Sequence, residues 1–170
     1  NTIMISPSIF CINEFSRIYG SSYNNFKKYY IPHASELNEN IYKTKFNKKP
    51  VIIGNWSSEL KGSNYIDKLI NKTPNIKYDL YGLKNIQPIW ADNFKVAVSN
   101  SKMGLNLSQG KSIKYYSSDR ITQLIANGLL TFIDKKTQLN DFFNKDEVIF
   151  YNSLEDLANK ITKYSNNDSL

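Results

Sequence analysis

The feature that most constrains the fold is a regular alternation of short strand-like runs and helical stretches that begins at residue 50. The strand-like runs are residues 51–53, 77–81, 103–107, 129–133 and 147–151, and the helical stretches are 63–72, 90–101, 119–127, 139–144 and the segment from Ser153 onward. Strands that alternate with helices in this way are typical of a parallel sheet with helices on both faces. We therefore predict an α/β, Rossmann-like domain of about five parallel strands over residues 50–170.

Two local signals support these boundaries. Gly128 follows the helix over 119–127 as a left-handed C-terminal cap would, and Leu129 then begins a strand. Ser153 and Asp156 have the spacing of a capping box at the start of the last helix.

Residues 1–49 are less regular and are interpreted as a separate part of the chain. Residues 3–10 and 28–31 have the composition of strands, residues 11–19 that of a helix, and residues 33–49 are polar and patternless. We predict that residues 33–49 form a linker, so that the main domain begins at residue 50. The chain does not begin with Met, and we expect it to start partway through a longer protein.

The net charge of +7 is compatible with several anionic partners. Nucleic acid, an anionic membrane surface and phosphorylated small molecules all fit, and so does a lysine- and asparagine-rich coding bias. The basic residues form no long block, since Lys27-Lys28 and Lys48-Lys49 are only pairs. Because a dedicated DNA reader usually carries a basic stripe or a known motif, we expect no nucleic-acid partner.

The sequence also indicates a compartment. No run approaches the roughly 18 apolar residues of a transmembrane helix, and the N-terminus lacks the features of a signal peptide. Cys11 is the only cysteine, which excludes an internal disulfide and fits a reducing compartment. We expect the protein to be cytoplasmic. We further expect it to make peripheral contact with the inner face of an anionic membrane.

Several reaction classes lose support because their residues are missing. His33 is the only histidine and lies in the expected linker, which disfavours a hydrolase with an imidazole base. One His and one Cys do not supply a zinc site of the usual spacing. The chain contains no Asp-x-Asp pair, no P-loop and no Gly-x-Gly-x-x-Gly fingerprint. We therefore disfavour ATPases, dehydrogenases and metal-dependent transferases, and expect no cofactor.

Polar loops follow the predicted strands at the positions where an open α/β sheet binds its ligands. After the first strand, Gly54 would let the backbone approach a ligand closely, and Lys61 would bring a charge to a phosphate. The simpler interpretation of this loop is a solvated turn. The polar segment from Asn106 to Ser112 follows the third strand and could line the same cleft.

A second candidate lies at the start of the helix over 119–127. Unpaired N–H groups at this end favour an anion, and Arg120 could hold a diphosphate through two hydrogen bonds. The simpler interpretation is that Ser118 or Asp119 caps the helix while Arg120 pairs with a neighbouring acid. Tyr115 and Tyr116 could stack on a base or a sugar, or be half-buried packing residues.

These segments together resemble the C-terminal domain of group-1 and spore-maturation (CgeB-like) glycosyltransferases. The resembling segments are Ile53-Gly54-Asn55-Trp56 with Lys61-Gly62, Met103 to Ser108, Ser118-Asp119-Arg120 with Gln123, Ala126 to Leu130, and Glu147 to Tyr151. The resemblance covers residues 50–165, and residues 1–49 look like the end of an N-terminal domain and a hinge.

The resemblance implies the donor-binding domain of a two-domain (GT-B) glycosyltransferase that binds a nucleotide-diphosphate sugar without a catalytic metal. The acceptor would be a glycan, a lipid-linked acceptor or a surface polysaccharide. The implied substrate-binding residues are Gly54, Asn55, Lys61, Ser108, Ser118, Asp119, Arg120 and Gln123. Base and ribose would lie near Arg120 to Gln123, and Lys61, Arg120 and helix N–H groups would stabilise the leaving diphosphate. A catalytic base would come from the N-terminal domain, so we expect this chain alone to bind donor without transferring sugar.

Three positions depart from the family pattern. Asn55 stands where the family often has Arg, Gln123 where it often has Glu, and Tyr115 where the first residue of a paired-glutamate motif would fall. These departures leave open whether the reaction retains or inverts the anomeric configuration. They also keep an alternative function open, that of a non-catalytic Rossmann-like nucleotide-binding or interaction module.

Overall fold

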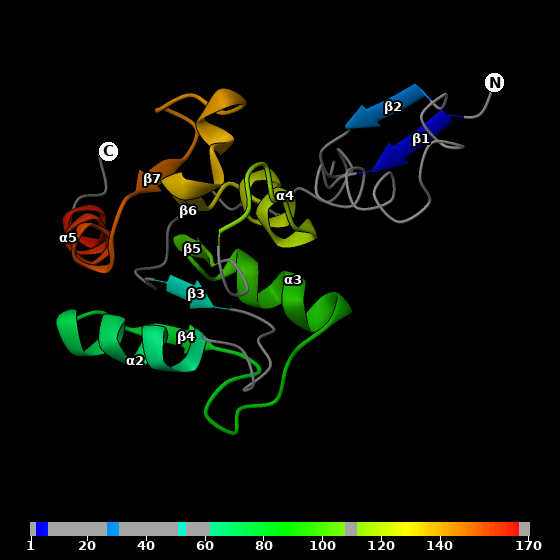
Figure 1. The fold of residues 1–170 in the computed structure, drawn as a ribbon. Coiled ribbons are helices and arrows are strands. Elements are labelled where there is room, and N and C mark those ends of the chain that lie inside the picture. The colour runs from blue at the N-terminus through cyan, green and yellow to red at the C-terminus, as the bar shows by residue number, and fades with distance from the viewer. Residues whose placement is uncertain (1–2, 7–26, 31–50, 54–61, 108–111, 167–170) are drawn as a thin grey trace.

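A computed structural model describes residues 3–6, 27–30, 51–53, 62–107 and 112–166 (Figure 1). Its strands are β1 (Ile3–Ser6), β2 (Lys27–Tyr30), β3 (Val51–Ile53), β4 (Tyr78–Leu80), β5 (Met103–Asn106), β6 (Leu130–Asp134) and β7 (Ile149–Tyr151). Its helices are α2 (Gly62–Lys72), α3 (Ala91–Ser99), α4 (Asp119–Ala126) and α5 (Leu154–Ser165), with 3-10 turns η3 (Lys135–Thr137) and η4 (Leu139–Asp141).

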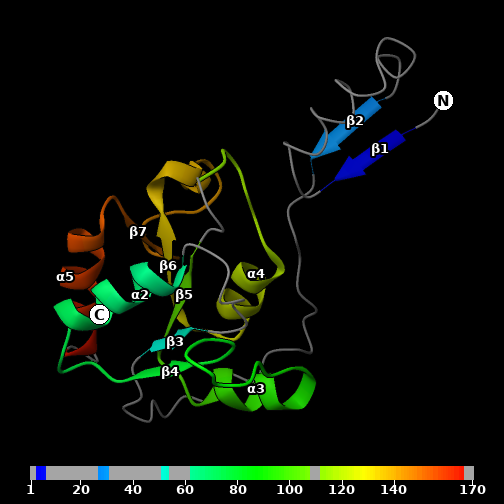
Figure 2. The same cartoon turned by 60° about the horizontal axis from the view of Figure 1, so that its bottom comes forward.

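The strands form two parallel sheets. β1 pairs with β2, and the larger sheet has the strand order β4-β3-β5-β6-β7. In Figure 2, α2 and α5 lie on one side of the larger sheet and α3 and α4 on the other. This arrangement agrees with the predicted α/β, Rossmann-like fold. The predicted helix over 11–19 and the predicted linker over 33–49 lie outside the described residues.

One predicted helix, over 139–144, is wrong. The chain there forms only the 3-10 turn η4, and Gln138 before it adopts a left-handed conformation with φ 55°. The Glu147 carboxylate accepts a hydrogen bond of 2.7 Å from the Asn144 amide, which turns the chain toward β7. Leu139, in the 3-10 turn, is already buried, whereas Phe142 after it is 46% exposed. Continuing the helix past Leu139 would therefore bury little more apolar surface.

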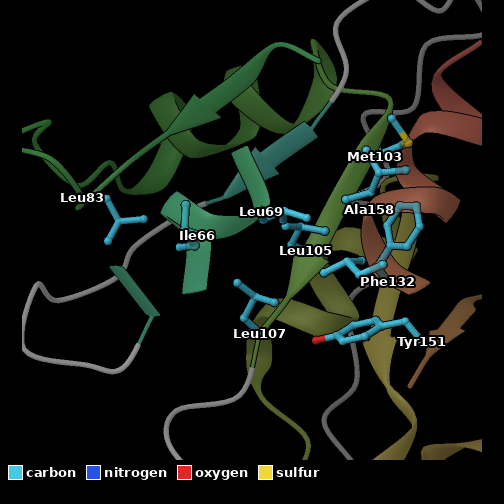
Figure 3. Packing of buried hydrophobic residues seen from close by; sticks show 11 residues of the cluster. Ile66, Leu69, Leu83, Met103, Leu105, Leu107, Phe132, Tyr151 and Ala158 are labelled. Carbon is cyan, nitrogen blue, oxygen red and sulfur yellow. The ribbon is translucent and has the colours of Figure 1, made fainter. Parts of the chain in front are cut away.

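The core lies on both faces of the larger sheet because successive residues of β5 and β6 point to opposite sides. Leu105 and Phe132 belong to the cluster that includes α2 and α5, which Figure 3 shows together with Ile66 and Leu69. On the opposite face, Ile133 packs in a cluster with Ile121 of α4.

Gly104 of β5 lets α4 approach the sheet closely. A Cβ atom at this position would lie 2.7 Å and 2.8 Å from the two methyl carbons of Leu124 on α4. The missing side chain at Gly104 therefore fixes how α4 lies on β5, and with it where the first turn of α4 lies.

The strand order also indicates where a ligand is expected to bind. The chain passes from β3 outward to β4 and then crosses back to β5 on the other side of β3. In open α/β sheets, ligands bind outside the carboxyl ends of the two strands at which the order reverses. Here these strands are β3 and β5, and β5 ends at the buried residue Asn106.

Gly128 ends α4 as predicted. It has a positive φ of 75°, its N–H donates to Ile125 O at 2.9 Å, and the Leu129 N–H donates to Leu124 O at 3.0 Å. These are the two bonds of a Schellman motif. The following strand begins at Leu130, one residue later than predicted.

We expect Gly128→Val to lower the free energy of unfolding by more than about 1 kcal/mol, because a β-branched residue resists positive φ. Urea unfolding of the purified chain measures this change. Gly128→Asn is the matched control, since Asn adopts the left-handed region more readily and should cost less. Equal losses for Val and Asn would contradict a conformational cause.

The capping box predicted at α5 is confirmed in part, because Asp156 binds the amide of Asn152, the residue before the N-cap, in place of that of Ser153. The Ser153 hydroxyl accepts a hydrogen bond from the Asp156 amide at 3.1 Å, and the Asp156 carboxylate accepts one from the Asn152 amide at 2.9 Å.

None of the helices in the described part of the chain has the length and apolar character that crossing a membrane requires.

Candidate functional site

The sequence-predicted site residues fall into two groups. Gly54, Asn55, Lys61 and Ser108 lie outside the described residues. Ser118, Asp119, Arg120 and Gln123 lie at the start and in the first turns of α4, which follows the carboxyl end of β5. The four described residues do not share one environment, because they point in two directions from α4.

Ser118 and Arg120 point toward the end of β5. The Ser118 hydroxyl donates to Asn106 Oδ1 at 3.1 Å, and Arg120 Nη1 donates to the Leu107 carbonyl at 3.4 Å. Ser118 occupies the N-cap position but its side chain makes no capping hydrogen bond, so the expected cap is wrong there. The hydroxyl is held by Asn106 instead, which leaves the first-turn N–H groups of α4 without that acceptor.

Arg120 is a partly buried cation beside the carboxyl end of β5. Burial lowers the pKa of Arg120 from its usual value, and the nearby Tyr116 acts in the opposite direction. Since arginine stays protonated in proteins, the guanidinium remains charged at neutral pH. A charge in such partly dry surroundings interacts more strongly with an anion than a charge on an open surface.

Asp119 and Gln123 point toward α3. Gln123 Nε2 donates to Asp119 Oδ2 at 3.0 Å, and Asn127 Nδ2 donates to Gln123 O at 2.8 Å. The three residues are four apart, so they lie along one face of α4. Together with the start of α3 they line a pocket of about 330 Å³.

The α3 side of this pocket supplies rings and a positive charge. Trp90, Phe94 and Lys95 line it, and the Trp90 side chain is 65% exposed. Trp90 is the N-cap residue of α3 although its side chain has no oxygen for capping, and Ala91 next to it has a φ of 48°. Strained backbone and an exposed indole are features that cluster at binding sites. These residues were not predicted as site residues from the sequence. The only sequence signal for them is that an aromatic residue, Trp90, stands at the start of a predicted helix.

Tyr115 anchors the segment that leads into α4. Its φ is 57°, its amide donates to Thr137 O at 2.7 Å, and its hydroxyl donates to Asp141 Oδ2 at 2.6 Å. This last bond is the main reason that the pKa of Tyr115 is raised. The Tyr115 ring packs edge-on against Phe142 with ring centroids 5.0 Å apart, and Lys114 Nζ lies 4.7 Å from the centroid of the Tyr115 ring. These contacts favour the packing interpretation of Tyr115 over stacking on a ligand.

A second polar cluster lies at the ends of β6 and β7. Asp134 accepts hydrogen bonds from the Ser112 hydroxyl at 2.7 Å and from the Lys136 amide at 2.9 Å. Burial raises the pKa of Tyr151, and Tyr65 and Asp134 raise it further. Burial likewise raises the pKa of Tyr65 on α2. Both shifts favour the neutral, protonated hydroxyl group.

Comparison with known proteins gives one family. A model of a family described as glycosyl transferase-like matches residues 57–170, which include α2 to α5 and β4 to β7. Curated proteins yield no match to the chain.

Proposed function

Because the chain belongs to the glycosyl transferase-like family, we propose that it is the donor-binding half of a GT-B glycosyltransferase of the group-1 or CgeB-like kind. The proposed reaction transfers a sugar from a nucleotide-diphosphate sugar to a glycan, lipid-linked or surface-polysaccharide acceptor without a catalytic metal. The proposed location is the cytoplasm, at the inner face of the membrane, where an acceptor of this kind would be reached.

The pocket between α3 and α4 carries this proposal. It combines two aromatic rings, Trp90 and Phe94, with the carboxylate and amide of Asp119 and Gln123. A nucleoside needs this combination, because its base stacks on rings and its ribose hydroxyls donate to and accept from polar side chains. We propose that the base lies against Trp90 and the ribose against Asp119 and Gln123.

The diphosphate is proposed to lie at Arg120. Asp119 and Arg120 are adjacent in the first turn of α4, so a nucleotide whose ribose contacts Asp119 would carry its phosphates around the start of the helix. The N–H groups of that turn and the guanidinium of Arg120 attract a diphosphate. Gly54, Asn55, Lys61 and Ser108 remain proposed contacts with the ligand.

These positive groups would act on the leaving group. In sugar transfer, the bond between the anomeric carbon and the diphosphate oxygen breaks, and a bond to an acceptor hydroxyl oxygen forms. Negative charge grows on the departing diphosphate, so fixed cations and N–H groups stabilise the transition state more than the bound donor.

A thermal-shift panel of UDP-, GDP-, ADP- and CMP-sugars tests the proposed function. A ligand at 100 times its dissociation constant should add about 2.7 kcal/mol to the stability of the chain. No shift with any member would favour the alternative, a non-catalytic interaction module.

Trp90→Ala should weaken binding of the matched nucleotide by about 1–2 kcal/mol, because a base loses its stacking surface. Isothermal titration should show a similar loss for the nucleoside, since the phosphates are not involved. Val96→Ala is the control: Val96 is also an exposed apolar residue of α3, at 59% exposure, but does not line the pocket. Equal affinity of the Trp90 variant and the unmodified chain would contradict the proposed position of the base.

A further inference from the structure

A second pocket lies at the opposite side of the α/β domain from β4. It has a volume of about 540 Å³ and is formed by η3, β7, α5 and the segment between η3 and β7. It shares no lining residue with the pocket between α3 and α4. β7 is the edge strand of the larger sheet, so this pocket opens along a sheet edge.

The described lining of the pocket carries positive charge. Lys135, Lys145 and Lys160 line it, and no Asp or Glu does among the described residues. Lys160 is already engaged, since its ammonium group donates to Asp156 Oδ2 at 2.8 Å and to the Phe150 carbonyl at 2.7 Å. Lys135 and Lys145 are exposed and form no ion pair with any residue in the described ranges. Two ammonium groups therefore remain for an anionic ligand.

The remaining lining combines half-buried rings with carboxamides. Phe143 and Tyr164 are half-buried residues of the lining, and Asn140, Asn144 and Asn152 are exposed residues of it. Rings pack on the apolar face of a sugar, and carboxamides both donate to and accept from hydroxyl groups. The volume is within the usual range for a small-molecule site.

The sheet edge itself is unsuited to a peptide strand. An added strand needs the free N–H and C=O groups of the edge, and β7 is only three residues long. The Lys160 ammonium group already occupies the Phe150 carbonyl, and a lysine placed in this way protects an edge from pairing. These features favour a ligand that uses side chains rather than backbone.

We infer that this pocket binds an acidic carbohydrate, that is, a sugar unit bearing a carboxylate or a phosphate. Lys135 and Lys145 hold the acidic group, the rings of Phe143 and Tyr164 face the sugar ring, and the asparagines bind hydroxyls. This site is independent of the donor pocket, and the inference does not depend on the proposed transferase reaction.

Isothermal titration of the full chain with four probes tests the inference. The probes are a hyaluronan tetrasaccharide, glucose 6-phosphate, the neutral tetrasaccharide of N-acetylglucosamine, and tetraglutamate. We expect the hyaluronan tetrasaccharide or glucose 6-phosphate to bind at least tenfold more tightly than the neutral tetrasaccharide and tetraglutamate, and the tighter of the two distinguishes a uronate from a sugar phosphate. Binding of tetraglutamate as tight as that of the best acidic sugar, or no binding of either acidic sugar, would overturn the inference.

Variants then locate the binding. The double variant Lys135→Gln/Lys145→Gln should weaken acidic-sugar binding about tenfold, the effect of losing one or two charged hydrogen bonds. Lys136→Gln/Lys77→Gln removes the same charge from exposed lysines outside the lining and should leave affinity within about twofold. Equal weakening by both pairs would mean that net charge alone attracts the sugar, and the pocket would be rejected as its site. All four positions are exposed, and unchanged melting temperatures exclude unfolding as the cause.

Discussion

Replacing Phe132 with alanine is expected to lower the free energy of unfolding by about 3–5 kcal/mol. Phe132 is fully buried in the middle of β6, between β5 and β7. Its ring meets Tyr164 of α5 edge-on, with centroids 6.4 Å apart, and belongs to the cluster that joins α2 and α5 to the sheet. Because strands on both sides hold β6 in place, the surrounding residues can close only part of the resulting cavity. Urea unfolding followed by circular dichroism measures the change.

Phe142→Ala provides a matched control, since it makes the same chemical change at a residue that is 46% exposed. The Phe142 ring contacts Tyr115 and lies outside the main cluster, so its loss should cost about 1 kcal/mol or less. Losses of equal size at Phe132 and Phe142 would contradict the assignment of the core to the sheet face under α2 and α5.

Sequence patterns predicted the helices and strands around Phe132 well, because local signals define them. The run over 129–133 is apolar except for Thr131 and follows a glycine cap, and both features belong to the residues themselves. The strand order could not be predicted in this way, because it depends on contacts between distant segments. One such contact is that of Gly104 with Leu124, whose close packing only the folded chain reveals. The helix expected over 139–144 was wrong because its apolar residues did not reveal the left-handed turn at Gln138.

The candidate site was predictable to a similar extent. A polar loop followed by a helix start identified Ser118, Asp119 and Arg120, but not the two directions in which they point. Trp90 and Phe94 escaped sequence reasoning because they become part of a pocket only when α3 lies beside α4. The family match supports the glycosyltransferase part of the resemblance, while its group-1 or CgeB-like part remains a proposal.

Arg120→Ala should weaken binding of a nucleotide diphosphate by about 1.5–3 kcal/mol, the contribution of a hydrogen bond to a charged group. This loss corresponds to roughly a tenfold to hundredfold rise in the dissociation constant. The corresponding nucleoside should bind almost as before, since its base and ribose are proposed to contact Trp90, Asp119 and Gln123 instead. Isothermal titration with the nucleoside, the monophosphate and the diphosphate of one base measures the difference.

The comparison between ligands is needed because Arg120 also has a structural contact. Its guanidinium donates to the Leu107 carbonyl, so removing it could disturb the end of β5 and weaken every ligand equally. Arg120→Lys keeps the charge but loses the paired donors, and should recover only part of the diphosphate affinity. A loss that is the same for nucleoside and diphosphate would mean that Arg120 positions the strand end and does not hold the phosphates. A loss confined to the diphosphate would place the leaving group at the first turn of α4, because a merely structural role gives no reason for the phosphates to matter.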